Sequence, residues 1–267
     1  MALVVVLTRA RRDTARNGRP PSARFTAERE HPLGEALIER GHEVVMWWDE
    51  PPGECIVQEP EVAFLRAGGE RNLARAEVLR ARGTRVINEP GAHRAGADKL
   101  LAAELLGAAG VPTPLTVCDP SELNVQVLVA KPRHGSGGSG VLRQPAAEAS
   151  PVDGTIFQPF LEATDHLRFT VVAGEVVAGE RRHLAPQEFR ANLAAGASTE
   201  GIDPGAEPEA ARVAVSATRA LGLDLAGVDV VATATGPVVL EVNPATTLWH
   251  PDEGARLRVA AALADLA

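Results

Sequence analysis

A lysine followed by a glycine-rich run is the segment of this chain with the clearest chemistry. Lys131 follows the apolar run 127–130, and the sequence HGSGGSG occupies residues 134–140. Glycine lets the backbone approach a ligand closely, so that several N–H groups and one ammonium group can surround an oligophosphate. The segment therefore predicts a phosphate-binding loop. A flexible linker is the alternative, but it would not lie between two apolar strands with a lysine at its entrance.

Two well-known glycine motifs do not describe this loop. Residues 135–140 match the dinucleotide pattern G-x-G-x-x-G, yet that pattern requires a helix at its third glycine. Here residues 141–145 read as a short strand that a proline ends. In a Walker loop the lysine closes the motif, whereas Lys131 precedes the glycines. The pattern of strand, glycine loop and strand predicts a hairpin with a mobile tip.

Two carboxylates near the carboxyl end of the chain form a second candidate site. The apolar runs 227–232 and 238–243 predict an antiparallel hairpin. With its turn centred on Thr235, this hairpin places Asp229 directly opposite Glu241.

The chemistry of this second site is that of a hard cation. Asn243 lies two residues after Glu241 and therefore on the same face of its strand. Like charges about 5 Å apart repel one another unless a cation lies between them, and oxygen ligands favour magnesium. The pattern predicts a Mg²⁺ site. The alternative is that these side chains lie on a solvated outer face of the hairpin with their charges turned apart. A second alternative is a pairing of the two strands that differs by one residue.

Several further segments accompany these two sites in a fixed order. In chain order they are Ala97-Asp98-Lys99, AGVPTP at 109–114, Lys131 with its glycine loop, IFQPFL at 156–161, Arg168 in a strand, Arg181-Arg182, EFRANL at 188–193 with Gly196, and GVD at 227–229 with EVN at 241–243. With these segments the chain resembles the ATP-grasp carboxylate–amine ligases over about residues 86–244. It is most similar to the branch that contains the ribosomal-protein glutamate ligase and the lysine-biosynthesis ligases that act on carrier proteins.

The resemblance implies an α/β fold of the α+β ATP-grasp type. The expected arrangement is an N-terminal parallel α/β domain at residues 1–90, followed by two α+β subdomains that grip ATP between them. The central subdomain at 91–157 would carry the glycine-rich lid loop. The C-terminal subdomain at 158–267 would carry the magnesium site.

The resemblance also implies a role for each matching residue. ATP phosphates would be held by Lys99 and Lys131 and covered by Gly135, Ser136, Gly137, Gly138 and Ser139. Adenine would meet the hinge residues Gln158, Pro159 and Phe160, and the ribose contact stays open between Glu162, Asp165 and His166. The transferred phosphate and the acyl group would face Arg182, Asn192 and Arg190. One or two Mg²⁺ ions, with Mn²⁺ as a substitute, would bind Asp229, Glu241 and Asn243.

The implied reaction is the ATP-dependent joining of a carboxylate to an amine through an acyl phosphate, with release of ADP and phosphate. The implied partners are a small-molecule carboxylate and amine, with a peptide or carrier protein as an alternative acceptor, and the protein would be a homo-oligomer. A phosphotransferase and a nucleotide-binding regulator without turnover are the alternative functions.

One departure from the resemblance concerns the segment after the metal motif. Residues 244–250 read PATTLWH, where relatives have a small, often glycine-containing turn that borders the acceptor pocket. Trp249 and His250 are therefore candidates for an unusual specificity. Packing of Trp249 in the core is the alternative.

Composition limits the classes of partner. The chain of 267 residues carries a formal net charge of −8, which argues against a nucleic-acid partner because duplex binders carry a basic stripe. The two cysteines, Cys55 and Cys118, favour a reducing compartment without a disulfide framework. No apolar run approaches the length of a membrane span, and residues 2–7 read as a first buried strand rather than a signal peptide. These features predict a cytoplasmic protein without a membrane partner.

Residues 1–90 alternate predicted strands and helices, which indicates a parallel sheet. The strands are expected at 3–7, 43–48 and 84–88, and the helices at 32–41 and 69–82; two later helices are expected at 208–221 and 253–266. The connection after the first strand is rich in arginine, with Arg9, Arg11, Arg12, Arg16, Arg19 and Arg24. Since open parallel sheets bind ligands beyond the carboxyl ends of their strands, this loop is a candidate contact for an anionic substrate or carrier. A solvated loop is the alternative.

Overall fold

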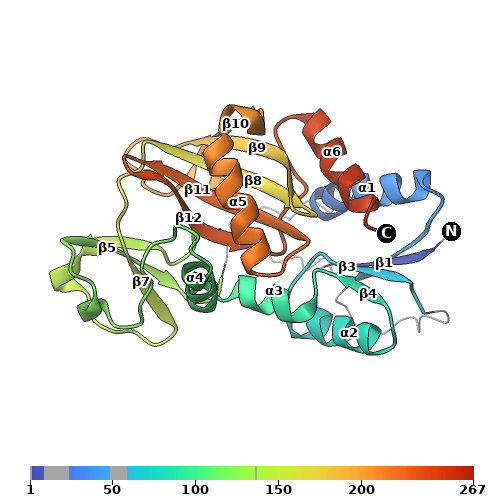
Figure 1. Ribbon diagram of the computed structural model, residues 1–267, viewed down its shortest axis with the longest axis horizontal. Coiled ribbons are helices and arrows are strands. Elements are labelled where there is room, and N and C mark those ends of the chain that lie inside the picture. The colour runs from blue at the N-terminus through green and yellow to red at the C-terminus, as the bar shows by residue number, and fades with distance from the viewer. Residues whose placement is uncertain (1, 9–23, 49–58, 136) are drawn as a thin grey trace.

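The computed structural model describes residues 2–8, 24–48, 59–135 and 137–267, and these residues form three β-sheets (Figure 1). The hypothesis about the arginine-rich loop concerns residues 9–23 almost entirely, and these lie outside the described residues. The same holds for Ser136 and Cys55. No helix among the described residues is both long and apolar enough to cross a membrane.

The first sheet is parallel, with the strand order β2-β1-β3-β4. Its elements are β1 (Leu3–Thr8), α1 (Arg24–Glu39), β2 (Glu43–Trp48), β3 (Val62–Leu65), α2 (Glu70–Ala81) and β4 (Arg85–Ile87). Every residue of β1 is buried, as expected for a strand that is covered on both faces. The expected parallel sheet is confirmed.

Two details of this first sheet differ from the sequence-based expectation. Strand β3 was not expected, because four apolar residues are too short a run to separate a strand from a buried loop. Helix α1 begins at Arg24 rather than at Pro32, and the proline lies inside it. A proline removes one backbone donor, yet the helix continues on both sides of it, so Pro32 does not mark the start of the helix.

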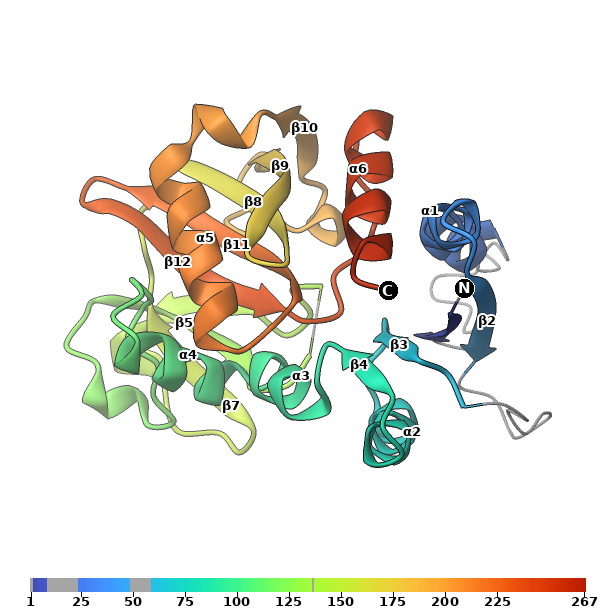
Figure 2. The ribbon, with the colours of Figure 1, turned by 45° about the vertical axis from the view of Figure 1, so that its right-hand side comes forward.

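The C-terminal helix α6 (Glu253–Ala264) returns to this first sheet. Its residues Val259 and Leu263 share a buried cluster with Val4 and Val6 of β1, on the face that α1 also covers. Helix α2 packs on the opposite face, against Val5 and its neighbours. Figure 2 shows α6 between α1 and the largest sheet, so that the last helix joins the first part of the chain to the last.

A three-stranded antiparallel sheet with the order β6-β5-β7 follows. Its strands are β5 (Val127–Pro132), β6 (Leu142–Pro145) and β7 (Thr155–Pro159), preceded by α3 (Pro90–Ala97), α4 (Lys99–Ala108) and the 3₁₀ turn η1 (Pro120–Glu122), with η2 (Ala146–Glu148) after β6. Strands β5 and β6 pair on either side of the glycine loop, so the expected hairpin is confirmed.

The largest sheet is antiparallel and has the order β10-β9-β8-β11-β12. Its elements are β8 (Asp165–Val172), β9 (Glu175–His183), η3 (Leu193–Ala195), β10 (Ser198–Ile202), η4 (Pro204–Ala206), α5 (Pro208–Ala220), β11 (Leu225–Thr233) and β12 (Gly236–Asn243). Helix α5 covers one face, where Ala214 and Ala217 pack against Phe169 and Val228. Helix α6 packs on part of the other face, near Val172 and Ala178, and the rest of that face lines a cavity.

The hairpin of β11 and β12 pairs Asp229 with Glu241, as expected, but its turn and its register differ from the expected ones. Its turn is tighter than a turn centred on Thr235, since Thr233 pairs with Gly236. A β-bulge between Asp229 and Val230 then shifts the register by one residue. The α+β architecture is confirmed, whereas the domain boundaries at 90/91 and 157/158 stay a prediction.

Candidate active site

A cavity lies between the three-stranded sheet and the open face of the five-stranded sheet. Its walls combine an apolar set, Val129, Pro159, Leu161, Val231 and Leu240, with a charged set, Lys99, Lys131, Arg182, Asp229 and Glu241. An apolar region beside a cationic region suits a ligand with an aromatic base and a polyphosphate chain.

Most of the residues singled out from the sequence line this cavity. They are Lys99, Lys131, Gly135, Gly138, Ser139, Gln158, Pro159, Phe160, His166, Arg182, Arg190, Asn192, Asp229 and Glu241. Gly137, Glu162, Asp165 and Asn243 are not among the lining residues. The structure therefore brings together residues that lie far apart in the sequence.

The two lysines approach the cavity from different elements. Asp98 caps α4 by accepting the N–H groups of Leu100 and Leu101, which places Lys99 in the first turn of the helix. Lys99 Nζ donates to Gly135 O at 2.7 Å and lies 3.7 Å from Glu241 Oε1. Burial lowers the pKa of Lys131 on β5, although the nearby Glu241 carboxylate opposes this shift. A bound polyphosphate would favour the charged form of Lys131.

The glycine loop rests on the segment 188–192. Arg190 Nη1 donates to Gly138 O at 3.2 Å, and Glu188 fixes Arg190 through a contact of 2.6 Å. The hydrogen bond from Arg190 lowers the pKa of Glu188 to about 2. Gly138 has a φ of +72°, and a Cβ at this position would lie 2.5 Å from Asn192 Oδ1. Glycine is therefore required here for both its backbone angle and its missing side chain.

The hinge after β7 forms the apolar part of the cavity. Gln158 is buried, and its Nε2 donates to Thr116 Oγ1 at 2.8 Å. The Arg143 guanidinium lies 4.1 Å from the centre of the Phe160 ring, and Phe189 meets the same ring edge-on at 6.2 Å. These contacts fix an aromatic wall on which a base can stack.

The three candidates for a ribose contact lie in different surroundings. Of them, only His166 lines the cavity. Burial lowers the pKa of His166, although the charge of Asp165 opposes this shift. Asp165 itself is bound to Arg181 at 2.6 Å, and its Oδ1 accepts the N–H of His166. Asp165 can therefore fix the backbone of His166, while the histidine ring faces the ligand site.

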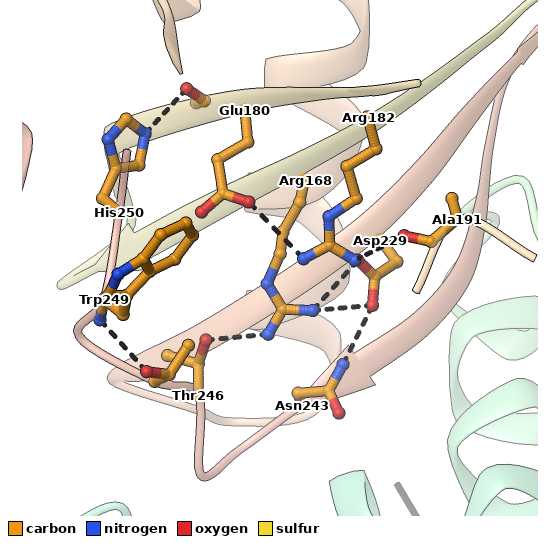
Figure 3. Close-up of polar contacts among 11 residues, drawn as sticks. Arg168, Glu180, Arg182, Ala191, Asp229, Asn243, Thr246, Trp249 and His250 are labelled. Atoms are coloured by element: carbon orange, nitrogen blue, oxygen red, sulfur yellow. Dashed lines mark hydrogen bonds and ion pairs between the residues drawn. The ribbon is translucent and has the colours of Figure 1, made fainter. Parts of the chain in front are cut away.

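Asp229 accepts four hydrogen bonds from three different side chains (Figure 3). Arg168 Nη1 donates to both of its oxygens at 3.0 and 2.8 Å, and Arg182 Nη1 donates to Oδ1 at 3.2 Å. Asn243 Nδ2 donates to Oδ2 at 3.1 Å. Two cations and one amide therefore hold this side chain in a single orientation.

The donor set around Asp229 suits a hard divalent cation. Burial raises the pKa of Glu241, and the like charge of Asp229 raises it further, whereas Lys99 lowers it. A cation between the two carboxylates would remove this cost. Among the described residues, no three His, Cys, Asp or Glu side chains lie together in a way that could hold a metal ion. The amide of Asn243 lies beside Asp229, and its side-chain oxygen would be the third protein ligand.

Two charged residues lie beside Asp229 to which the sequence assigned no role: Arg168, which belongs to the resemblance, and Glu180, which does not. Arg168 lies directly opposite Asp229 in the pairing of β8 with β11 and directly opposite Glu180 in the pairing of β8 with β9. Glu180 is buried, and its Oε2 lies 3.5 Å from Arg182 Nη2. Their place beside Asp229 follows from the order of the strands in this sheet, and residue patterns do not predict strand order.

Trp249 and His250, the candidates for an unusual specificity, follow the metal motif, and their influence on specificity stays a prediction. His250 is buried, its Nδ1 accepts the N–H of Asp252 at 3.0 Å, and its Nε2 therefore donates to Gly179 O at 2.9 Å. Trp249 is half-buried, and neither residue lines the cavity. The histidine ring thus ties this segment to β9.

Asn88 connects the first sheet to the hairpin that carries the metal ligands. It is buried after β4, and its Nδ2 donates to Leu225 O at 2.7 Å and to Pro244 O at 2.9 Å. Its Oδ1 accepts the N–H groups of Asp224 and Leu225. One side chain therefore binds the start of β11 and the residue after β12, which fixes both ends of the hairpin.

The fold and this cavity define a protein of the ATP-grasp class. A family model described as a RimK-like ATP-grasp domain matches residues 97–266, and the chain belongs to this family. The suspected resemblance is thereby confirmed.

Two relatives named probable alpha-L-glutamate ligase match about three fifths of the chain. The protein from Parasynechococcus marenigrum is 35% identical over 61% of this chain and 39% of its own length. The protein from Aeromonas salmonicida is 34% identical over 60% of both chains. The match therefore spans between about two fifths and three fifths of these relatives.

A solved structure of the ATP-grasp ligase PsnB in complex with a minimal precursor shares the fold. It aligns with a TM-score of 0.68 and 22% identity, over 98% of this chain and 97% of that one. The expected ATP-grasp fold is thereby confirmed.

Proposed function

We propose that this protein is an ATP-dependent ligase that joins a carboxylate to an amine through an acyl phosphate and releases ADP and phosphate. The observation that carries the proposal is the pair of opposed carboxylates, Asp229 and Glu241, in a cavity that also contains Lys99, Lys131 and Arg182. The cationic side chains would bind a polyphosphate, the two carboxylates would bind its metal ion, and the apolar walls would contact a base. Membership of the RimK-like ATP-grasp family supports it.

The first step activates the carboxylate, which is a poor acyl donor when ionised. A carboxylate oxygen attacks the γ-phosphorus of ATP, the bond to the bridging oxygen breaks, and ADP leaves. Lys99 and Lys131 neutralise the charge that develops on the phosphoryl oxygens. When bound at Asp229, Glu241 and Asn243, Mg²⁺ supplies further charge neutralisation and alignment of the phosphates.

In the second step the amine attacks the acyl carbon, loses a proton, and expels phosphate. Arg182 lines the cavity, and its guanidinium group carries a permanent positive charge there. A donor of this kind can stabilise the tetrahedral oxyanion. Arg190 and Asn192 hold the glycine loop over the site, and the closed loop keeps water away from the acyl phosphate.

The names of the relatives suggest one substrate. Two of them are named probable alpha-L-glutamate ligase, and we infer that L-glutamate is one of the amino acids joined. The complex of PsnB with its precursor suggests a peptide as the second partner, with a small amine or a carrier protein as alternatives. A cytoplasmic homo-oligomer that also accepts Mn²⁺ completes the proposal.

The test is Mg²⁺-dependent release of ADP and phosphate from pooled amino acids and short peptides, each with L-glutamate, followed by mass spectrometry of the products. A product at the summed substrate masses minus water is expected, and Glu241→Ala should abolish it. Glu200→Ala is the matched control, because Glu200 is exposed on β10. A phosphorylated product would instead indicate a phosphotransferase. Absence of ADP release with every pool would exclude free amino acids and short peptides as acceptors and would favour a carrier-protein acceptor or a nucleotide-binding regulator.

A further inference from the structure

Arg168 joins the metal carboxylate to the segment 244–250 (Figure 3). Its Nη1 donates to both oxygens of Asp229, and its Nη2 donates to Thr246 Oγ1 at 2.9 Å. A guanidinium group is planar and rigid, so fixing the direction of Nη2 also fixes the direction of Nη1. The Thr246 hydroxyl therefore determines how Arg168 presents its donors to Asp229.

Gly227 provides the space in which Arg168 and Thr246 meet. It lies two residues before Asp229 on β11, and its missing side chain would point at these two groups. A Cβ at Gly227 would approach Thr246 Oγ1 and Arg168 Nη2 more closely than van der Waals contact permits. The contact between the threonine and the arginine thus depends on a glycine at this position.

Thr246 is held from its other side by the first sheet. Arg66 follows β3, and its Nη2 donates to Thr246 O at 2.6 Å. Asn88 binds the neighbouring Pro244 O at 2.9 Å. With 2% of its surface exposed, Thr246 is enclosed between the carboxyl end of a parallel strand and Arg168. Thr246 therefore links the carboxyl edge of the first sheet to Asp229 through Arg168.

We propose that Thr246 and Arg168 are positioning residues that set the orientation of Asp229 for metal binding, and so couple the segment 244–250 to the phosphate end of the site. The inference rests on the proposed function, because it takes Asp229 as a Mg²⁺ ligand. Thr246 touches no reacting group in this account, and it acts through Arg168.

The first test compares Thr246→Val with Thr246→Ser. Valine keeps the shape of the side chain and removes the hydroxyl, whereas serine keeps the hydroxyl and removes the methyl group. Binding of Mn²⁺ in the presence of ADP is followed by electron paramagnetic resonance, so that the readout does not depend on turnover. We expect Thr246→Val to weaken Mn²⁺ binding about tenfold, as the loss of one hydrogen bond to a charged group implies, and Thr246→Ser to restore it.

Steady-state kinetics give a second readout that a purely structural role would not move. Thr246→Val should raise the Mg²⁺ concentration needed for half-maximal rate by about the same tenfold factor, while the KM for ATP at saturating Mg²⁺ stays close to that of the wild type. Thr218→Val is the matched control, because Thr218 is a fully buried threonine of α5 whose hydroxyl bonds only within its helix. It should lower thermal stability without changing Mg²⁺ dependence.

Two further variants keep the inference testable if Thr246→Val folds poorly. Gly227→Ala should weaken Mn²⁺ binding in the same direction, since the new Cβ displaces the threonine and the arginine. Arg168→Lys keeps the charge, but one ammonium group cannot bind Asp229 and Thr246 with the same geometry. It should therefore also weaken Mn²⁺ binding.

The outcomes separate this inference from the proposed function. Wild-type protein that binds no Mn²⁺ with ADP would overturn the metal site and the proposed function together. Wild-type binding combined with unchanged binding in Thr246→Val or Arg168→Lys would overturn the inference alone. A defect in Thr246→Ser as large as that in Thr246→Val would assign the effect to packing of the methyl group and would also overturn it.

Discussion

Asp229 faces Glu241 across β11 and β12 because a β-bulge separates Asp229 from Val230. On the turn side of the bulge, Val230 pairs with Val239, and a continuous register would have placed Asp229 opposite the apolar Leu240. The bulge therefore decides whether the two carboxylates meet. Bulges near active sites commonly redirect a side chain in this way.

Replacing Glu241 by glutamine tests the value of this pairing. Glu241→Gln keeps the size of the side chain and removes the second carboxylate of the metal site. We expect kcat/KM to fall about a hundredfold or more, since removal of one charge-stabilising group in an active site has effects of that order. Glu200→Gln on the exposed strand β10 is the control and should leave kcat/KM unchanged. Near wild-type activity in Glu241→Gln would show that catalysis does not depend on the charge of Glu241.

Alanine variants of two neighbouring glycines can distinguish the effect of backbone strain in the loop from that of a steric clash. Gly137 and Gly138 both have left-handed φ angles, +74° and +72°, but only a Cβ at Gly138 meets Asn192. Alanine at either position should cost about 1 kcal/mol of strain in the closed loop.

Gly138→Ala should therefore lower kcat by more than Gly137→Ala. It should lower kcat by a smaller factor in the Asn192→Gly background than in the wild type, because the clash is absent there. Steady-state kinetics of these variants and of Asn192→Gly alone measure this. Equal losses in Gly137→Ala and Gly138→Ala would show that contact with Asn192 does not matter.

The local features of the site follow from the residue pattern, and its distant residues follow only from the resemblance, whereas the contacts of Arg168 and Asn88 follow from neither. Lys131, its glycine loop and the pairing of Asp229 with Glu241 are each encoded within about fifteen residues. In contrast, Arg168 reaches Asp229 across 61 residues. Asn88 reaches Leu225 across 137. Contacts of this separation depend on strand order, and periodicity of apolar residues does not contain that information.

The same limit explains the open ribose contact. Glu162, Asp165 and His166 follow the hinge closely, and all three have polar side chains that could reach a hydroxyl group. What distinguishes them is that Asp165 already binds Arg181, which comes from the next strand, β9. Residue type and spacing alone could not rank the three candidates.

His93 should make stability depend on pH. It is buried in α3, and burial together with the charges of Arg66 and Arg94 lowers its pKa from 6.5 to about 4. The unfolded chain therefore binds a proton near pH 6.5, whereas the folded protein does so only near pH 4. The stabilising contribution is complete above pH 6.5 and is lost as the pH falls towards 4.

Between pH 7 and pH 5 this loss amounts to about 2 kcal/mol of the free energy of unfolding. Urea denaturation at the two pH values measures it, with His93→Gln as the comparison that lacks the titrating group. The wild type should lose about 2 kcal/mol more than the variant. An equal loss in both proteins would mean that His93 titrates normally.

The affinity for the metal–nucleotide complex should be highest at pH values between the pKa of Glu241 and the pKa of Lys131. Burial raises the pKa of Glu241, so the carboxylate must lose its proton before it can bind the metal, and affinity falls on the acid side. Burial lowers the pKa of Lys131, so its charge, and the affinity for phosphate, fall on the alkaline side.

Isothermal titration calorimetry with MgADP over a range of pH values measures both limits. Glu241→Gln should remove the acid limit together with most of the metal affinity. Lys131→Arg should remove only the alkaline limit, because arginine stays charged at every accessible pH. Buffers with different ionisation enthalpies should show proton release at acid pH and proton uptake at alkaline pH. Affinity that is independent of pH in the wild type would contradict both assignments, since a metal bound by a protonating carboxylate cannot escape this linkage.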